Sequence, residues 1–137
     1  MASLPDRSVV TCFLESESKI LLLRRSERVG SYQGRWAGVS GYIEKPPDEQ
    51  ALTEIEEETG LSGKEVTFIK RGKFLTVDDE ATGVRWIVHP YLFHIEERDK
   101  ISIDWEHQEF RWVDPKEIDA YQVVPGLKEA LTRVYQS

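Results

Sequence analysis

Residues 51–61 read ALTEIEEETGL, a stretch that crowds four glutamates into positions 54 to 58 and closes them with a glycine. Asp48 is a plausible N-cap ahead of it, and Gly60 suits the left-handed position that ends many helices. The sequence therefore predicts a helix that ends at about Thr59. Like charges three or four residues apart destabilise a helix by about 0.2–0.5 kcal/mol per pair, so the crowding calls for an explanation.

Three of the four glutamates share one face of this helix. At about 100° per residue, Glu54, Glu57 and Glu58 lie within roughly a third of the circumference. The apolar stripe beside them consists of Ala51, Leu52 and Ile55. Carboxylate oxygens gathered in this way are the ligands that Mg²⁺ and Mn²⁺ prefer. A solvent-exposed acidic face would show the same pattern, so the helix alone leaves both interpretations open.

The segments around the helix are mainly typical of strands. Strands are predicted over Arg7–Leu14, Lys19–Arg25, Trp36–Ser40, Val66–Phe74, Val84–His94 and Phe110–Val113. Loops are predicted over Ser26–Arg35, Glu44–Pro47 and the stretch TVDDEATG that starts at Thr76. DPKEI predicts a short helix with Pro115 in its first turn, and Pro125–Tyr135 a C-terminal helix. Strands on both sides of a central helix predict one α+β domain over residues 1–137, with α/β/α layers.

Composition narrows the class of protein. The chain has 137 residues, of which 39% are hydrophobic and 31% charged, as in ordinary globular domains. Its longest aliphatic run, Ile20–Leu23, is far shorter than a membrane span, and its first residues lack the apolar core of a signal peptide. A single cysteine, Cys12, cannot form an internal disulfide. We therefore expect a cytoplasmic protein without a membrane partner.

Charge is distributed unevenly along the chain. The net charge of −7 argues against binding to a nucleic acid polymer, which depends on many Lys and Arg contacts. Between Lys19 and Arg35 there are five basic residues and one acidic residue, whereas between Glu44 and Glu58 there are seven acidic residues and one basic residue. The basic stretch and the acidic stretch could hold a phosphate next to a metal ion, or could form two solvated surfaces of opposite sign.

The segment from Gly41 to Leu61 resembles the Nudix box, whose pattern is GX5EX7REUXEEXGU with U an aliphatic residue. Gly41 matches the opening glycine, and the second half of the pattern is matched by Glu54, Ile55, Glu57, Glu58, Gly60 and Leu61. The flanking stretches LLLRRS and GRWAGVSGYIE look like the strands and loop that precede a Nudix box. EFRWVDPKEI looks like the family's closing strand and short helix. On these grounds the chain is identified as a member of the Nudix hydrolase family.

The resemblance implies an α+β fold of the Nudix type, an α/β/α sandwich with a mixed central sheet. It implies Mg²⁺ or Mn²⁺ held by Glu54, Glu57 and Glu58, with the carbonyl of Gly41 as a further ligand. The implied reaction is hydrolysis of a pyrophosphate bond in a nucleoside diphosphate linked to another moiety. The implied partner is a small molecule, namely a nucleotide, a dinucleoside polyphosphate or a nucleotide sugar. Many relatives dimerise, so a homodimer is compatible with the resemblance.

Two departures from the family pattern keep a second interpretation open. The stretch from Gly41 to Glu54 is two residues shorter than the pattern, and the position of the family's first glutamate falls on Pro47 or Lys45. Thr53 replaces an arginine that usually orients a box glutamate through a charge-assisted hydrogen bond. The alternative is a catalytically weak Nudix-like module that binds a nucleotide or phosphorylated metabolite in a regulatory role.

Hydrolysis also needs a carboxylate that accepts a proton from water. The candidates are Glu57, Glu58 and Glu106. Glu106 belongs to WEHQEFRWV, which is similar to a segment of diadenosine polyphosphate hydrolases in which the glutamate of EHQ lies near the metals. The three histidines have no metal-ligand spacing among them, and His107 is expected at most to help place a phosphate.

Substrate contacts are predicted from the basic stretch that precedes the box. Arg25 and Arg35 are candidate phosphate contacts, and Trp36 is a candidate for stacking on a base, as are Trp86, Tyr32 and Trp105. The alternative for each arginine is an ordinary solvated surface position, and the alternative for Trp36 is a place in the core. The sequence alone leaves these alternatives open.

Overall fold

The computed structural model describes residues 4–135. Its elements in chain order are β1 (Asp6–Ser16), β2 (Lys19–Arg25), β3 (Trp36–Ala37), β4 (Val39–Tyr42), α1 (Pro47–Thr59), β5 (Val66–Arg71), β6 (Leu75–Asp79), β7 (Val84–Ile95), the 3₁₀ helix η1 (Arg98–Lys100), β8 (His107–Val113), the 3₁₀ helix η2 (Pro115–Ala120) and α2 (Leu127–Val134). Most of these bounds lie within a few residues of the predicted ones.

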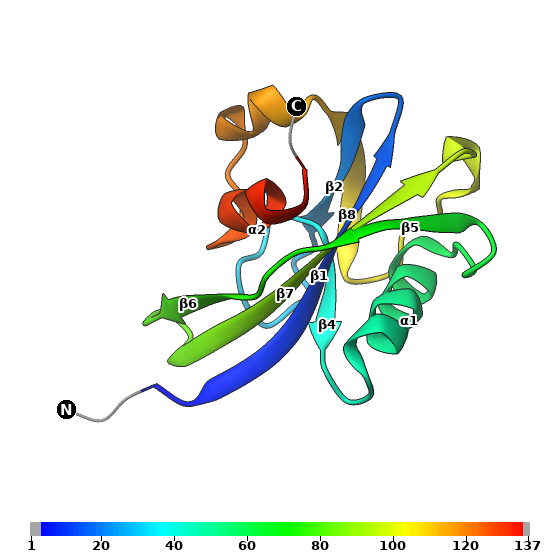
Figure 1. Ribbon diagram of the computed structural model, residues 1–137. Helices are drawn as coiled ribbons and strands as arrows, with labels where there is room; N and C mark the ends of the chain where they lie inside the picture. Colours follow the sequence, from blue (N-terminus) through cyan, green and yellow to red (C-terminus); the bar gives the residue numbers. More distant parts are fainter. Residues whose placement is uncertain (1–3, 136–137) are drawn as a thin grey trace.

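Within residues 4–135 the eight strands form one mixed sheet. β1 and β7 run parallel at its centre, and the other strand pairs are antiparallel. Figure 1 shows α1 and α2 on opposite sides of this sheet. The predicted α+β class and its α/β/α layering around a mixed sheet are therefore confirmed. None of the helices between residues 4 and 135 has the length and apolar character that crossing a bilayer requires.

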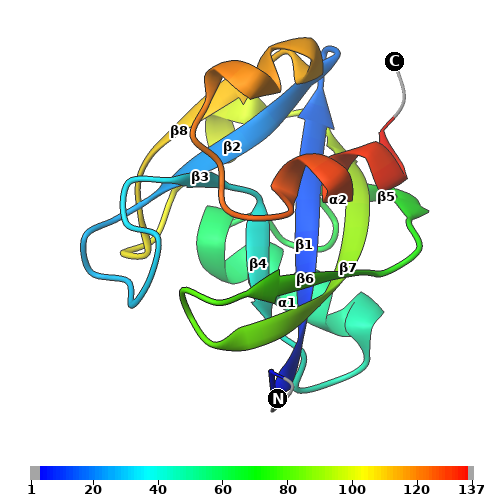
Figure 2. The same cartoon turned by 90° about the vertical axis from the view of Figure 1, so that its left-hand side faces the viewer.

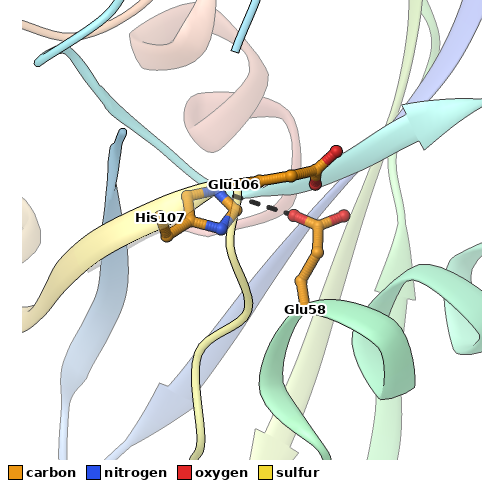
Figure 3. Close-up of side chains that lie close together, drawn as sticks. All are labelled: Glu58, Glu106 and His107. Atoms are coloured by element: carbon orange, nitrogen blue, oxygen red, sulfur yellow. Dashed lines mark ion pairs between the residues drawn. The ribbon is translucent and has the colours of Figure 1, made fainter. Parts of the chain in front are cut away.

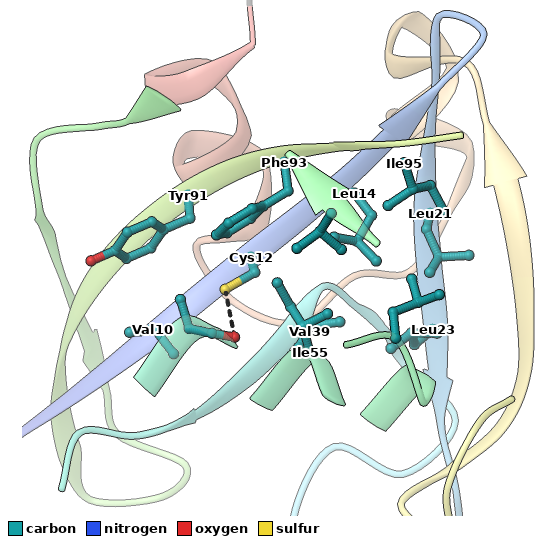
Figure 4. Packing of buried hydrophobic residues seen from close by; sticks show 13 residues of the cluster. Val10, Cys12, Leu14, Leu21, Leu23, Val39, Ile55, Tyr91, Phe93 and Ile95 are labelled. Carbon is teal, nitrogen blue, oxygen red and sulfur yellow. Dashed lines mark hydrogen bonds between the residues drawn. The ribbon is translucent and has the colours of Figure 1, made fainter. Parts of the chain in front are cut away.

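Two hydrophobic cores, one on each face of the sheet, follow from the alternation of side chains along the strands. Leu21 and Leu23 of β2 belong to the core under α1, whereas Ile20 and Leu22 belong to the core under α2. Successive side chains of a strand point to opposite faces, so one unbroken aliphatic run supplies both cores. Figure 4 shows the α1 core, in which Ile55 packs among residues of β1, β2, β4 and β7.

The predicted strand Trp36–Ser40 is divided at Gly38 into two short strands. β3 pairs with β2, and β4 leaves that strand to pair with β1 (Figure 2). A Cβ atom at Gly38 would lie 3.0 Å from the carbonyl oxygen of Cys12 and 3.3 Å from Cγ2 of Thr11, so a larger residue would crowd β1. The division brings β4, and with it Gly41, against α1.

The start of α1 and one of its apolar positions differ from the prediction. Pro46 is the N-cap and Pro47 the first helical residue, and no side chain caps the helix. Pro47 has no backbone N–H, so this first helical position leaves no donor unpaired, which suits proline to it. The carboxylate of Asp48, the predicted cap, instead accepts a hydrogen bond of 2.6 Å from the hydroxyl of Tyr91. Leu52, predicted in the apolar stripe, is 39% exposed.

The stretch TVDDEATG, predicted to be a connection, is a strand over its first half. β6 pairs with β7 in an antiparallel hairpin. Its two aspartates both have partners in the structure. Asp78 accepts a hydrogen bond of 2.6 Å from Arg85, and Asp79 accepts one of 3.1 Å from the indole N–H of Trp86. These contacts allow two consecutive aspartates to end a strand.

Candidate active site

The buried side of α1 combines an apolar part with an acidic part. Ile55 is fully buried in the core, and Glu58, about one turn later, is buried almost as completely, with 1% of its surface exposed. Glu54 is half-buried and Glu57 is exposed. The helix thus carries its three predicted metal ligands at different depths, and Glu58 is the deepest.

These carboxylates open onto a cavity of about 530 Å³. A cavity of this size accommodates a ligand as large as a nucleotide. The predicted site residues that line it are Arg25, Gly41, Glu54, Glu57, Glu58 and Glu106. Segments far apart in the sequence, namely the end of β2, β4, α1 and the residues that precede β8, therefore contribute to one site.

The backbone of β4 lies directly against Glu54. A Cβ atom at Gly41 would collide with the carboxyl group of Glu54, so any other residue would displace this carboxyl group from its position. The buried side chain of Gln50 donates a hydrogen bond of 2.8 Å to Glu54 Oε2, and its own oxygen accepts one of 3.0 Å from the backbone N–H of Glu44. Gln50 thereby orients Glu54, a role that the sequence analysis did not assign to it.

Glu58 is a buried carboxylate that receives few hydrogen bonds from the protein. Its Oε1 accepts one long hydrogen bond of 3.4 Å from the backbone N–H of Ser40, and its Oε2 has no hydrogen-bond partner among residues 4–135. Burial, reinforced by the nearby carboxylate of Glu106, raises the pKa of Glu58 well above its usual value. An unpaired charge at this depth costs free energy unless a cation neutralises it.

A second acidic group reaches Glu58 from the segment before β8. Figure 3 shows Glu106 and His107 facing Glu58, and potential ligand atoms of these three residues all lie within 4.8 Å of one another. His107 is buried, and its Nδ1 lies 3.1 Å from Oδ1 of Asp104. Burial and the charge of Asp104 raise the pKa of Glu106, whereas burial lowers the pKa of His107.

Arg25 supplies a positive charge to the same cavity. Its Nε donates a hydrogen bond of 3.0 Å to the carbonyl oxygen of Ser31, which holds the guanidinium in place. Partial burial lowers its pKa, and the carboxylates of Glu106 and Glu58 oppose this shift. An arginine keeps its charge at neutral pH in any case, so it can bind a phosphate that enters the cavity.

Arg35 and Trp36 are not part of the cavity lining. Arg35 is exposed and donates to the carbonyl oxygen of Val123 at 3.2 Å. Trp36 is 7% exposed in the core under α2, where its ring meets that of Tyr121 edge to face at 5.5 Å. The substrate contacts predicted for both residues therefore stay predictions that the geometry does not favour.

The aromatic side chains of Tyr32, Tyr42 and Trp86 line another part of the cavity, and of these only Tyr42 was not a candidate from the sequence. The rings of Tyr42 and Trp86 lie 6.1 Å apart between centroids. Asp79, which is buried, accepts hydrogen bonds from the hydroxyl of Tyr32 at 2.7 Å and from Trp86 at 3.1 Å. This network fixes two of the aromatic walls relative to each other.

The sequence model of the NUDIX domain matches residues 5–134. The chain belongs to the Nudix family. This confirms the family predicted from the box, and with it the class of enzyme, a Nudix pyrophosphohydrolase. The three box glutamates that the sequence singled out are those that the Nudix fold places on the cavity wall.

Solved structures share this Nudix fold. The MutT protein from Methanosarcina mazei Go1 has a TM-score of 0.77 and 22% identity over 98% of this chain and 96% of that one. An Ap4A hydrolase from C. elegans has a TM-score of 0.74 and 16% identity over 93% of each chain. A bifunctional NMN adenylyltransferase/ADP ribose pyrophosphatase from Francisella tularensis has a TM-score of 0.77 and 17% identity over 96% of this chain and 41% of that one. At such identities the likeness establishes the fold.

Proposed function

We propose that this chain hydrolyses a pyrophosphate bond in a nucleoside diphosphate linked to another moiety, with the help of bound Mg²⁺ or Mn²⁺. The substrate would be a nucleotide, a dinucleoside polyphosphate or a nucleotide sugar. The observation that carries the proposal is the carboxylate of Glu58, which is buried on the wall of a cavity of nucleotide size with no hydrogen-bond partner for Oε2 among residues 4–135. Family membership supports the reaction class.

The donor set fits a divalent cation. We assign Glu54, Glu57 and Glu58 as its carboxylate ligands and the carbonyl of Gly41 as a further one, since hard oxygen ligands suit both ions. The orphaned Oε2 of Glu58 and the glycine that lets Glu54 lie against β4 support this assignment. A cation bound here would cancel the repulsion among the carboxylates, polarise a phosphate and lower the pKa of a water molecule.

The protein's own groups would bind the substrate and accept the proton. Arg25 would contact a phosphate, since its Nη groups remain available beside the bond from Nε to Ser31. Glu57, Glu58 and Glu106 line the cavity and are the candidates that accept the proton of the attacking water. Substitution of each by glutamine, one at a time, would identify which of them is needed beyond metal binding.

The aromatic part of the cavity suits the nucleoside portion of the substrate. Trp86 and Tyr42 offer ring faces on which a planar base could stack, a contact worth about 1–3 kcal/mol. We propose these residues as base contacts in place of Trp36, which lies in the core. Asp79 would act indirectly, because it positions Trp86 and Tyr32.

The second candidate function is a regulatory module that binds the same ligands with little turnover. Thr53 favours it, because threonine cannot supply the charge of the family's arginine and here accepts a hydrogen bond of 2.7 Å from Lys45. The contact from Gln50 to Glu54 favours the enzyme, since it supplies an alternative way to orient a box glutamate. A measurement of turnover distinguishes the enzyme from the regulatory module.

The test is product release from nucleoside di- and triphosphates, dinucleoside polyphosphates and nucleotide sugars, with Mg²⁺, with Mn²⁺ and with chelator. Glu57→Gln is expected to lower turnover by about 10²–10³-fold, a loss typical of groups that stabilise charge in a transition state. Glu56→Gln is the matched control, since Glu56 is exposed and outside the cavity lining. If a metal ion raised the melting temperature but the protein hydrolysed none of the compounds, the result would favour the binding module.

A further inference from the structure

Three side chains form a line that ends at the deepest carboxylate of the site. The Nδ1 of His107 lies 3.1 Å from Oδ1 of Asp104. Its Nε2 lies 3.8 Å from Oε1 of Glu58, the contact that Figure 3 draws as a dashed line. The side chains of His107 and Glu58 are 3% and 2% exposed. The contact between imidazole and carboxylate is therefore shielded from bulk water.

The partners of His107 determine where its hydrogen lies. Because a carboxylate oxygen of Asp104 lies at Nδ1, we assign the imidazole hydrogen to Nδ1, which leaves the lone pair on Nε2. That lone pair faces Oε1 of Glu58, which is itself an acceptor. Their separation of 3.8 Å is too long for a hydrogen bond. Two acceptors thus face each other in a buried site with no hydrogen bond between them.

The other oxygen of Glu58 provides a second, independent observation. Oε2 is buried and has no hydrogen-bond partner in the part of the chain that the structure describes. Buried polar groups are rarely left unpaired, so Oε2, beside the single long bond of 3.4 Å from Ser40 to Oε1, indicates a missing positive partner. A cation with bonds of about 2.0–2.2 Å can join two atoms 3.8 Å apart. Glu106 offers a further carboxylate within the same 4.8 Å group.

We propose that His107, as a nitrogen ligand, and Glu106 join Glu58 in binding the cation of this site, and that the nitrogen ligand makes the site prefer Mn²⁺ to Mg²⁺. The inference rests on the proposed metal-dependent function and specifies the metal. Imidazole is a ligand of first-row transition metals, whereas Mg²⁺ takes oxygen ligands and water. Asp104 completes the arrangement of carboxylate, histidine and metal that orients ligating imidazoles.

A purely structural role for His107 makes a different prediction. Its backbone N–H donates to the carbonyl oxygen of Asp104 at 3.2 Å, so the residue also belongs to the turn before β8. If the imidazole only stabilised this turn, its removal would lower the melting temperature and leave the metal preference unchanged. Metal identity and nitrogen coordination are therefore the informative readouts, in addition to activity.

The experiment is pulsed EPR on Mn²⁺ bound to the full chain labelled with ¹⁵N-histidine, together with Mn²⁺ and Mg²⁺ titrations. We expect a ¹⁵N coupling from a directly bound imidazole. His107→Gln should abolish it and weaken Mn²⁺ binding by at least about 10-fold while changing Mg²⁺ binding far less, and Asp104→Asn should weaken Mn²⁺ binding about 10–100-fold. His89→Gln is the matched control, because His89 is a half-buried histidine outside the cavity lining.

The outcomes separate this inference from the proposed function. Mn²⁺ that binds the unaltered protein without ¹⁵N coupling overturns the role of His107 and leaves metal-dependent hydrolysis in place. A preference for Mn²⁺ that survives His107→Gln also overturns it. Failure of the unaltered protein to bind either cation overturns both. Because the coupling is measured first in the unaltered protein, the result does not depend on whether His107→Gln folds.

Discussion

Glu58 and Asp79 are both buried carboxylates on the lining of one cavity, but their surroundings differ. Asp79 accepts hydrogen bonds from the side chains of Tyr32 and Trp86 and from the backbone N–H of Thr82. Burial opposes its charge, yet these donors outweigh burial and its pKa is lowered. Glu58 has one long hydrogen bond from Ser40, and its pKa is raised.

The difference separates two uses of a buried charge. At Asp79 the fold itself supplies the donors, so the carboxylate stabilises the structure and fixes aromatic walls. At Glu58 the fold supplies burial and further negative charge but, among residues 4–135, no hydrogen bond from a cationic side chain, so the charged carboxylate is costly unless a cation binds. The aromatic lining is therefore held in place by the protein alone, whereas in our proposal a bound metal ion would complete the acidic lining.

The largest effect on stability should come from removal of Asp79. Asp79→Ala leaves the indole N–H of Trp86 and the hydroxyl of Tyr32 without their acceptor, and we expect a loss of about 3 kcal/mol in the free energy of unfolding. Chemical denaturation measures it. The matched control is Asp78→Ala, whose ion pair with Arg85 is largely exposed and worth about 0–1 kcal/mol. Equal losses in both variants would remove the distinction drawn for Asp79.

In the acidic lining of the cavity, the contact from Gln50 to Glu54 tests how a proposed metal ligand is oriented. Gln50→Ala removes the donor that holds Glu54 Oε2, and we expect metal affinity to fall about 10–100-fold, as for other residues that orient metal ligands. Calorimetric titration with Mn²⁺ measures the change. Gln122→Ala, at an exposed position outside the cavity lining, should leave the affinity unchanged. An unchanged affinity in Gln50→Ala would show that Glu54 needs no such support.

The smallest effect concerns His94, a charged group that has partners on both sides. Hydrogen bonds to Glu15 at 2.8 Å and Glu96 at 3.0 Å raise its pKa above 6.5. A raised pKa stabilises the fold below the unfolded value, and the stabilisation is lost as pH rises through the folded value. His94→Gln should therefore cost no more than about 1 kcal/mol in mildly acidic solution and less in alkaline solution. Melting temperatures at the two pH values check this, and equal losses would contradict it.

The linear motif predicted the half of the site that lies on one helix. Glu54, Glu57 and Glu58 occur in a single turn-and-a-half of α1, so periodicity alone places them on one face. The fold class and most strands were also predictable, because apolar runs such as Ile20–Leu23 reveal buried strands. The division of a strand at Gly38 and the strand β6 were not predicted, since both depend on contacts with other strands.

The remainder of the site depends on contacts between distant segments. His107 shows no metal-ligand spacing with the other histidines, and its proximity to Glu58 arises only when β8 packs near α1. Gln50 resembles an ordinary helix residue until its hydrogen bonds to Glu44 and Glu54 are seen. Trp36 and Trp86 are equivalent in the sequence, and only the sheet decides that the first is in the core and the second lines the cavity.

The most direct test of the account is the melting temperature of Glu58→Gln and of the unaltered protein, each with chelator and with Mn²⁺. Without metal, we expect Glu58→Gln to melt higher at neutral pH, because the substitution removes a buried charge whose pKa is raised above 4.5 and whose cost grows as pH rises above that value. With Mn²⁺, the unaltered protein should be stabilised and the variant much less so. A variant that melts lower than the unaltered protein in chelator, or that responds equally to Mn²⁺, would contradict the claim that this carboxylate is buried to hold a cation.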